Sequence, residues 1–182
     1  MPYTVVETTL PDVIILEPRI FSDDRGFFFE SFSARDFAAA TWLAREFVQD
    51  NHSCSGRDVL RGLHYQVKRP QGKLVRVIRG VIYDVAVDLR HDSPTFGQWT
   101  GVTLSATNRR QLWVPEGFAH GFCVTSDAAE VAYKTTEYWH PEHDRSLLWS
   151  DPALGIDWPL RGEPLLAAKD AVAPCLADAE LF

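Results

Sequence analysis

Two neighbouring segments of the chain place a histidine and a lysine nine residues apart. His64 lies in residues 61–66 (Arg-Gly-Leu-His-Tyr-Gln), and Lys73 lies in residues 71–75 (Gln-Gly-Lys-Leu-Val). A neutral histidine can accept a proton near pH 7, and a lysine ammonium can stabilise a negative oxygen. Removal of a proton from a carbon next to a ketone needs both groups, because an enolate oxygen forms. The pair therefore favours enolate chemistry in one pocket.

The histidines do not have the spacing of a mononuclear metal site. Such a site often takes two ligands from one strand in a His-x-His step, but the candidate strand reads His64-Tyr65-Gln66. His120 could join His64 across a barrel, although no third ligand is evident. We expect the side chains of the remaining histidines to be exposed in turns: His52, His91, His140 and His143. The sequence therefore predicts neither a metal nor another cofactor.

Other polar and aromatic residues could complete a binding site. Tyr133, in a β-type run, could donate a proton opposite the base, although a single strand tyrosine more often lies in a core. Arginines bind phosphate oxygens in pairs, and amides or carboxylates bind sugar hydroxyls. Residues of these types are Arg25, Arg61, Gln49, Asp50 and Asn51. Tyr138 and Trp139 offer flat faces on which a nucleobase can stack.

Composition limits the class of protein. The 182 residues fit one domain spanning 1–182, and a net charge of −7 argues against a nucleic-acid surface. No apolar run reaches the length of about 18 residues that a membrane helix needs. The N-terminus lacks the pattern of a signal peptide. Three cysteines without a Cys-x-x-Cys spacing are typical of a reduced, cytoplasmic protein.

Short β-type runs separated by turn residues dominate the chain. We expect an all-β antiparallel jelly-roll barrel with one or a few short helices. The predicted strands cover residues 13–16, 27–32, 47–52, 59–67, 73–79, 81–89, 99–105, 111–114, 121–125 and 130–139. From His140 onward the sequence predicts ordered loop and a short terminal helix.

One helix is predicted after Ser33. Ser33 and Asp36 resemble a capping box. Apolar residues then recur at near-helical spacing at Phe37, Ala40, Ala44 and Phe47.

The strongest β signal lies on both sides of Gly80. Residues 73–79 and 81–89 are rich in β-branched residues, and we expect them to form a hairpin that turns at Gly80. In the second arm, alternation puts Asp84 and Asp88 on one face. The other face then carries Val81, Tyr83, Val85, Val87 and Leu89.

The segment that carries His64 does not fit simple alternation. A regular strand over residues 59–67 would point Arg61 and His64 to opposite faces. Gly62 lies between them and could allow a bulge that brings both to one side. The sequence alone does not decide between these arrangements.

Nine segments, in order and with matching spacing, resemble the dTDP-4-dehydrorhamnose 3,5-epimerase family of dTDP-L-rhamnose biosynthesis. They include Asp-Arg-Gly-Phe-Phe-Phe-Glu, Leu-Arg-Gly-Leu-His-Tyr-Gln and Trp-Val-Pro-Glu-Gly-Phe-Ala-His-Gly-Phe. The nine cover residues 24–30, 47–53, 60–66, 71–75, 84–88, 93–97, 113–122, 133–136 and 168–170.

The resemblance implies a role for each matching residue. His64 matches the proton acceptor, Asp170 the carboxylate paired with it, and Tyr133 the proton donor. Lys73 matches the lysine near the C4 oxygen. Positions that contact the nucleotide sugar are matched by Arg25, Glu30, Gln49, Asp50, Asn51, Arg61, His120, Asp144 and Lys169. Trp139 falls where the family usually has an aromatic residue, often tyrosine, stacked on thymine, and Tyr138 is its neighbour.

The family also implies a fold, a partner and a reaction. The fold is a cupin-type jelly roll, a double-stranded antiparallel β-helix, in a homodimer whose N-terminal strands extend the partner's sheet. The reaction uses no metal and inverts C3 and C5 of dTDP-4-dehydro-6-deoxy-D-glucose to give dTDP-4-dehydro-L-rhamnose, a precursor for lipopolysaccharide and O-antigen sugars. No membrane or nucleic-acid partner is expected.

Three alternatives stay open. A relative that epimerises only C3 or only C5 would carry almost the same motifs. A metal-dependent enzyme on the same barrel is the second alternative. A non-catalytic nucleotide-sugar sensor is the third, and the joint presence of a base and an acid disfavours it, because a binding protein needs neither.

Overall fold

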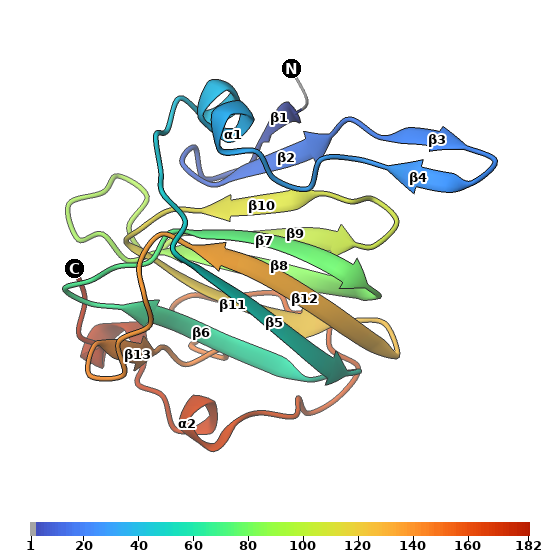
Figure 1. Cartoon of the computed structure of the whole chain (residues 1–182). Helices are drawn as coiled ribbons and strands as arrows, with labels where there is room; N and C mark the ends of the chain where they lie inside the picture. The colour runs from blue at the N-terminus through green and yellow to red at the C-terminus, as the bar shows by residue number, and fades with distance from the viewer. Residues whose placement is uncertain (1–2) are drawn as a thin grey trace.

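A computed structural model describes residues 3–182 and shows two antiparallel sheets that face each other, with a hairpin arm projecting from one edge (Figure 1). The six-stranded sheet has the order β1 (Tyr3–Glu7), β2 (Ile14–Pro18), β10 (Gln111–Val114), β7 (Lys73–Arg79), β12 (Ala128–Thr135) and β5 (Gln49–Gly56). The five-stranded sheet has the order β13 (Asp144–Ser146), β6 (Leu60–Gln66), β11 (Phe118–Val124), β8 (Val81–Asp88) and β9 (Trp99–Ser105). The predicted all-β jelly-roll architecture is confirmed.

In the described part of the chain, three short helices and one small hairpin complete the fold. The hairpin arm pairs β3 (Phe21–Asp23) with β4 (Gly26–Phe28). The helices are α1 (Ala34–Thr41), α2 (Ala168–Ala171) and the 3₁₀ helix η1 (Leu176–Asp178). No helix in the described part of the chain is both long and apolar enough to cross a membrane.

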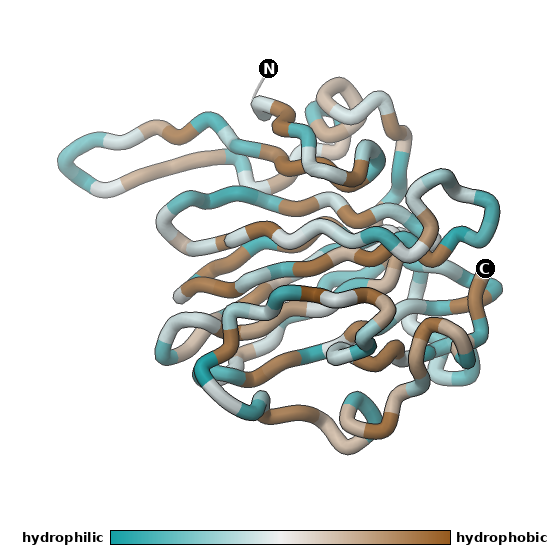
Figure 2. The backbone as a smooth tube through the Cα atoms, turned by 180° about the vertical axis from the view of Figure 1, so that it is seen from behind, coloured by the Kyte–Doolittle hydropathy of each residue, from teal (hydrophilic) through white to brown (hydrophobic). Residues whose placement is uncertain are grey.

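The main core lies between the two sheets. It takes Val75 and Val77 from the six-stranded sheet and Ile82 and Ala86 from the five-stranded sheet, all at most 6 % exposed. Figure 2 shows hydrophobic residues along the extended runs of the chain and hydrophilic residues at many of the turns. This packing holds the sheets as two walls, and side chains from both walls can face one cavity.

A second core forms on the outer face of the five-stranded sheet. Val85 and Val87 of β8 pack there against Leu147, Leu154 and Trp158 from the C-terminal part of the chain. The chain beyond β13 therefore covers this sheet from outside, and it carries α2 to a position beneath β6 (Figure 1).

The predicted hairpin at Gly80 is wrong. β7 pairs with β10 and β12, whereas β8 pairs with β9 and β11, so the two strands belong to different sheets. Gly80 is the corner between the sheets, with a φ of +79°, and a Cβ there would collide with the carbonyl of Ala128. The predicted alternation in β8 is confirmed, because Val85 and Val87 face the outer core whereas Asp84 lies opposite and is fully buried.

The predicted helix is confirmed at its start and wrong at its end. Ser33 accepts a hydrogen bond from the backbone N–H of Asp36 at 3.4 Å, as a helix cap should. The helix ends at Thr41, because Trp42 adopts a left-handed φ of 60°. Phe47 lies beyond the helix and packs edge-to-face on Phe37 at 5.3 Å between ring centroids. Its apolar spacing reflects this packing and not helical periodicity.

Other boundaries differ by a few residues from those predicted. The ranges 99–105 and 111–114 agree with β9 and β10. The strand predicted over 27–32 shortens to β4, and the one predicted over 130–139 is β12, which ends at Thr135. The strand predicted over 121–125 is β11, which begins at Phe118. The terminal helix is confirmed as α2, and the short strand β13 was not predicted.

Candidate active site

A cavity of about 330 Å³ opens between the two sheets. Both walls contribute to it: β6 and β11 from the five-stranded sheet, and β7, β12 and β5 from the six-stranded sheet. Its predicted lining residues are Arg61, His64, Lys73, His120, Tyr133, Trp139, Asp144 and Lys169. Four further lining residues were not singled out from the sequence: Ser53, Tyr65, Gln71 and Phe122.

A register shift in β6 places Arg61 and His64 on the same wall. His64 is opposite His120 of β11 and Arg61 is opposite Phe122, with an irregularity between these pairs. Gly62 lies at the irregularity with a φ of +112°, where a Cβ would come within 2.7 Å of the His120 carbonyl oxygen. The bulge that the sequence left open is therefore present, and it depends on a glycine.

The side chain of His64 is oriented by Asp170. Its Nε2 lies 2.7 Å from Asp170 Oδ1, and the second carboxylate oxygen accepts a hydrogen bond from the N–H of Gly62 at 3.2 Å. Asp170 is 1 % exposed and comes from α2, 106 residues further along the chain. A buried carboxylate bound in this way fixes the imidazole ring and can stabilise its protonated form.

The protonation of this pair follows from its surroundings. Burial lowers the pKa of His64 below its usual value, although the hydrogen bond with Asp170 opposes this. Burial raises the pKa of Asp170, but the hydrogen bonds from His64 and Gly62 outweigh it, so its pKa lies below the ordinary value. At neutral pH a neutral imidazole thus faces an ionised carboxylate, which is the state that a general base requires.

Lys73 begins β7 and reaches across the cavity to the opposite sheet. Its Nζ donates a hydrogen bond to the carbonyl oxygen of His64 at 3.2 Å, and the residue is 7 % exposed. Burial lowers the pKa of Lys73 to about 8, against the opposing effect of the carboxylates of Asp144 and Asp84. The ammonium is therefore a desolvated cation beside the base.

Tyr133 faces the cavity from β12, on the wall opposite His64. Its phenol has no hydrogen-bond partner within residues 3–182. Burial raises its pKa above the usual value, so the phenol stays protonated at neutral pH. An acid from one sheet and a base from the other thus flank the same space.

Charged and aromatic groups surround the mouth of the cavity. Arg61 donates from Nε to the hydroxyl of Ser55 at 2.9 Å, and Lys169 pairs with Asp144 at 2.7 Å. Trp139 is 57 % exposed, and its backbone N–H donates to Gln49 Oε1 at 3.1 Å. Tyr138, beside it, is 56 % exposed. The cations can meet an anion at the entrance, and the exposed rings can stack on a flat ligand.

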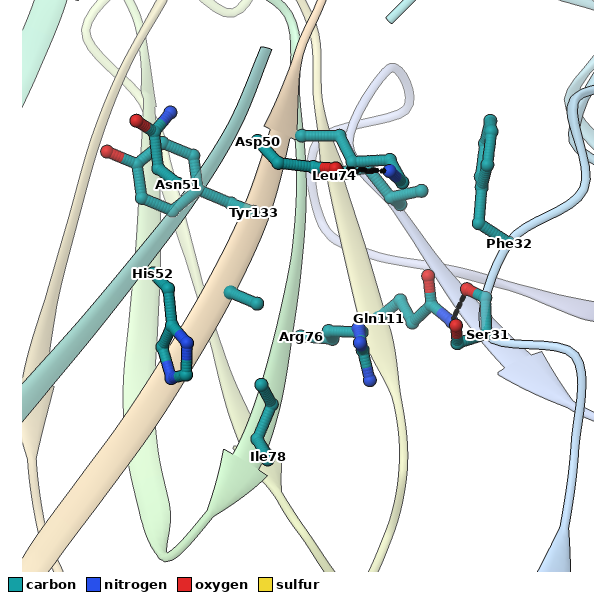
Figure 3. A pocket seen from close by; sticks show the side chains of 12 residues that line it. Ser31, Phe32, Asp50, Asn51, His52, Leu74, Arg76, Ile78, Gln111 and Tyr133 are labelled. Carbon is teal, nitrogen blue, oxygen red and sulfur yellow. Dashed lines mark hydrogen bonds and ion pairs between the residues drawn. The ribbon is translucent and has the colours of Figure 1, made fainter.

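A second hollow, of about 510 Å³, lies on the outer face of the six-stranded sheet (Figure 3). Asp50 belongs to this hollow and pairs with Lys134 Nζ at 2.9 Å, so the structure does not bring it into the inner cavity. Asn51 lines one end of the same hollow beside Tyr133 (Figure 3), and its side chain accepts a hydrogen bond from Gln49 at 3.0 Å.

Four predicted contact residues line neither hollow: Arg25, Glu30, Gln49 and Tyr138. The side chain of Arg25 is 90 % exposed on the β3–β4 arm, and among residues 3–182 it binds only Asp23, two residues away. Glu30 follows the arm and is also exposed. A single copy of the chain does not place Arg25 or Glu30 at the cavity.

The histidines outside the cavity differ in exposure. His91 is exposed as predicted, and so is His52, although it lies in β5 and not in a turn. His140 and His143 are half-buried, with their ring centroids 6.1 Å apart. Among residues 3–182, no three His, Cys, Asp or Glu side chains gather in an arrangement that could hold a metal ion.

Comparison with known proteins agrees with these observations. The family model described as dTDP-4-dehydrorhamnose 3,5-epimerase matches residues 7–178. Among curated relatives, the dTDP-4-dehydrorhamnose 3,5-epimerase of Pseudomonas aeruginosa is 60 % identical over 173 residues, covering 95 % of this chain and 96 % of the relative. That of Salmonella typhimurium is 56 % identical over 178 residues, covering 97 % of both.

Solved structures extend the comparison. A dTDP-6-deoxy-D-glucose-3,5-epimerase from Legionella pneumophila, in complex with dTDP-4-keto-L-rhamnose, superposes with a TM-score of 0.96 at 50 % identity, over 98 % of this chain and 95 % of that one. A 3′-monoepimerase from Streptomyces bikiniensis, in complex with dTDP-quinovose, superposes with a TM-score of 0.87 at 35 % identity, over 94 % and 87 %. The resemblance is strong to the first and weaker to the single-site enzyme.

Proposed function

The chain belongs to the dTDP-4-dehydrorhamnose 3,5-epimerase family, and from this premise we propose how its own residues carry out the reaction. The protein is an epimerase that inverts C3 and C5 of dTDP-4-dehydro-6-deoxy-D-glucose, giving dTDP-4-dehydro-L-rhamnose for dTDP-L-rhamnose biosynthesis. The observation that carries the assignment of roles is the placement of His64 with Asp170 on one wall, Tyr133 on the other, and Lys73 beside the base.

The reaction begins with removal of a proton next to the ketone. The carbonyl at C4 makes the hydrogens on C3 and C5 acidic, because the electron pair left on carbon moves onto the C4 oxygen. His64 takes the proton, and Asp170 stabilises the imidazolium that forms. Lys73 stabilises the enolate oxygen with its buried ammonium.

Inversion follows from the positions of the two proton carriers. Tyr133 gives a proton to the carbon from the face opposite His64, so the carbon–hydrogen bond re-forms on the other side of the ring. His64 is left with one extra proton and Tyr133 with one fewer. Exchange with water restores both groups, and the same cycle at the second carbon completes the double inversion.

The mouth of the cavity suits the dTDP part of the substrate. Arg61 is held by Ser55, and Lys169 lies near the same opening, so both cations can bind the diphosphate. Trp139, with Tyr138 beside it, can stack on thymine. Asp144 holds Lys169 at 2.7 Å, and His120 lies deeper, where the sugar would bind.

The arm supports a homodimer in which each copy completes the site of the other. Phe21, Phe27 and Phe28 are 50 %, 58 % and 66 % exposed, an apolar surface that a partner chain can cover. Arg25 and Glu30, which the family resemblance assigns to the substrate, lie on or beside this arm. We propose that they act at the partner's cavity. Free cysteines at positions 54, 123 and 175 fit a reduced cytoplasm.

Deuterium exchange tests the reaction. The purified protein is incubated with dTDP-4-dehydro-6-deoxy-D-glucose in D₂O, and the product is analysed by mass spectrometry and by NMR ring couplings. Two deuterons and the L-rhamno configuration are the expected result. One deuteron indicates a single-site epimerase, and none, with binding retained, indicates a sensor. The same assay is repeated after dialysis against a chelator. A metal-dependent enzyme would lose activity under this treatment, whereas the proposed epimerase should keep it.

Mixed dimers test the arm. At substrate concentrations well below the raised KM of Arg25→Ala, this variant and Tyr133→Phe are each expected to be weakly active alone. If Arg25 acts in the partner's site, a dimer of the two variants has one intact site, and mixing them restores part of the wild-type activity. Activity that only averages the two separate variants would contradict the proposed exchange.

A further inference from the structure

Asp84 is a buried carboxylate to which the mechanism above gives no role. It lies on the inward face of β8 and is 0 % exposed. One oxygen, Oδ1, lies 2.8 Å from Nε2 of His120. The other, Oδ2, is buried without a hydrogen-bond partner in the described part of the chain. A carboxylate in this setting is costly unless a nearby cation balances it.

Asp84 and His120 form a second histidine–aspartate pair beside the first. His120 of β11 is directly opposite His64 of β6 in the register, and both rings use Nε2 to meet an aspartate Oδ1. The pairs differ in exposure, because the His64 side chain is 28 % exposed whereas that of His120 is 7 % exposed. The less exposed pair is suited to holding a ring in place more than to exchanging protons with water.

Lys73 is a buried cation that lines the same cavity as His120, the ring that Asp84 holds. Desolvation lowers the pKa of the Lys73 ammonium, whereas the charges of Asp144 and Asp84 raise it and that of Lys169 lowers it. From β6 the group that faces Lys73 Nζ is the neutral carbonyl of His64. The register neighbours of Lys73 in β10 and β12 are the uncharged Val114 and Thr135.

Asp84 and Asp144 hold their negative charges in different ways. The Asp144 side chain is 21 % exposed and already pairs with Lys169 at 2.7 Å. Asp84 is fully buried, and within residues 3–182 the hydrogen-bonding partner of its carboxylate is the ring of His120. Of the two charges, that of Asp144 has the larger effect on the pKa of Lys73, and Asp84 adds to it from a position that solvent does not reach.

We propose that Asp84 is a positioning residue of the epimerisation, whose carboxylate fixes the His120 ring through Nε2 and provides the counter-charge for the buried Lys73 ammonium. This inference rests on the proposed function, in which Lys73 must be charged to stabilise the enolate. Without the carboxylate, the lysine would more readily lose its proton in the empty site, and fewer enzyme molecules would be ready for catalysis.

Asp84→Asn is the central variant. Asparagine keeps the size of the side chain and an oxygen that can accept the hydrogen bond of His120, and it removes only the charge. We expect the alkaline limb of the kcat/KM profile to move to lower pH by about one unit, the scale on which a neighbouring opposite charge acts. The Kd for dTDP, measured by calorimetry, should not change, because Asp84 does not line the cavity mouth.

His120→Asn provides the matched comparison. It removes the ring and leaves the Asp84 carboxylate with Lys73 as its neighbour, so kcat should fall while the alkaline limb stays in place or moves to higher pH. Opposite responses of the limb in the two variants support the proposal. A limb at the wild-type position in Asp84→Asn, with a uniform loss of activity at every pH, would overturn it and leave Asp84 a packing residue.

Asp84→Glu keeps the test decisive where the asparagine variant fails to fold. It retains the charge and displaces it, so the expected result is a lower kcat with the wild-type alkaline limb. A limb moved to lower pH in this variant counts against the counter-charge role. Failure of the proposed function itself is recognised separately, because the wild-type protein would then show no exchange in D₂O at any pH.

Discussion

The inner cavity and the β3–β4 arm hold residues of the same chemical types in opposite settings. In the cavity, His64 binds Asp170 at 2.7 Å, and Lys73 binds a backbone carbonyl at 3.2 Å. On the arm, Arg25 binds Asp23, two residues away, and both side chains are exposed. The cavity is organised by contacts from distant parts of one chain, whereas the arm is organised by contacts within its own turn.

This difference separates chemistry from binding. Groups that must transfer a proton need fixed geometry and low solvent exposure before the substrate arrives, because reorganisation at the moment of reaction is slow and costly. A group that binds a phosphate needs only to reach it. The proposed contacts of the arm can therefore form when a second copy of the chain binds. The catalytic groups of the cavity must already be in place within one copy.

Asp170→Asn should have the largest effect on the cavity. The amide keeps the shape but favours the wrong tautomer of His64, and in a protease triad this change lowers kcat about 10⁴-fold, so a loss approaching that scale is expected here. Steady-state kinetics measures it. Asp92→Asn, which alters an exposed carboxylate outside the cavity, serves as the control and should retain wild-type turnover. Equal kcat values for the two variants would remove Asp170 from the mechanism.

Lys73→Met should lower kcat less than Asp170→Asn does. Methionine occupies a similar volume and removes the ammonium, and loss of an oxyanion donor typically lowers kcat about 10²–10³-fold. Calorimetry with dTDP should give the wild-type Kd, since we propose that the nucleotide binds at the mouth of the cavity. Near-wild-type turnover in this variant would show that another group stabilises the enolate.

Arg25→Ala should act on binding more than on chemistry. Loss of one charged hydrogen bond to phosphate costs about 1.5–3 kcal/mol, which corresponds to a rise in KM of roughly ten- to a hundredfold. We expect kcat to change little, because no proton carrier is disturbed. A fall in kcat with unchanged KM would show that the arm takes part in the catalytic step, and the cavity and the arm would then not differ in role.

The pH dependence of kcat/KM should be set by ionisable groups of the cavity and not by those of the arm. His64 must be neutral, so activity falls as the pH drops through its pKa, which lies below 6.5. Lys73 must be charged, so activity falls as the pH rises through about 8. Beyond either limb the expected loss is about tenfold per pH unit. Arg25→Ala should leave both limbs of the pH profile at their wild-type positions. A limb that moves in this variant would show that the arm also affects the ionisation of the catalytic groups.

The sequence predicted local features of the fold better than their pairing. Alternation located β9 and β10 and the buried face of β8, because each depends on neighbouring residues. The partners of β7 and β8 depend on contacts with distant strands, and a glycine corner reads like a hairpin turn in sequence. In the same way, Phe47 mimics helical spacing because it packs back on the helix from outside.

The candidate site was predictable to different degrees. His64 and Lys73 could be singled out by their types and spacing, whereas Asp170 emerged only from the family resemblance, because nothing local links it to His64. Asp84 was recognised as sharing a face with Asp88 but not as a neighbour of His120. The outward position of Asp50 was accessible from alternation in β5, since Asp50 and Ser53 fall on opposite faces.

The distance along the chain between His64 and Asp170 has a consequence for biosynthesis. During translation, 106 residues must be added after His64 before its carboxylate exists. The barrel walls can begin to assemble in that interval, but the imidazole has no partner until α2 is synthesised and docks beneath β6. A prematurely terminated chain would therefore be inert, and the enzyme becomes competent only as one of the last steps of its own maturation.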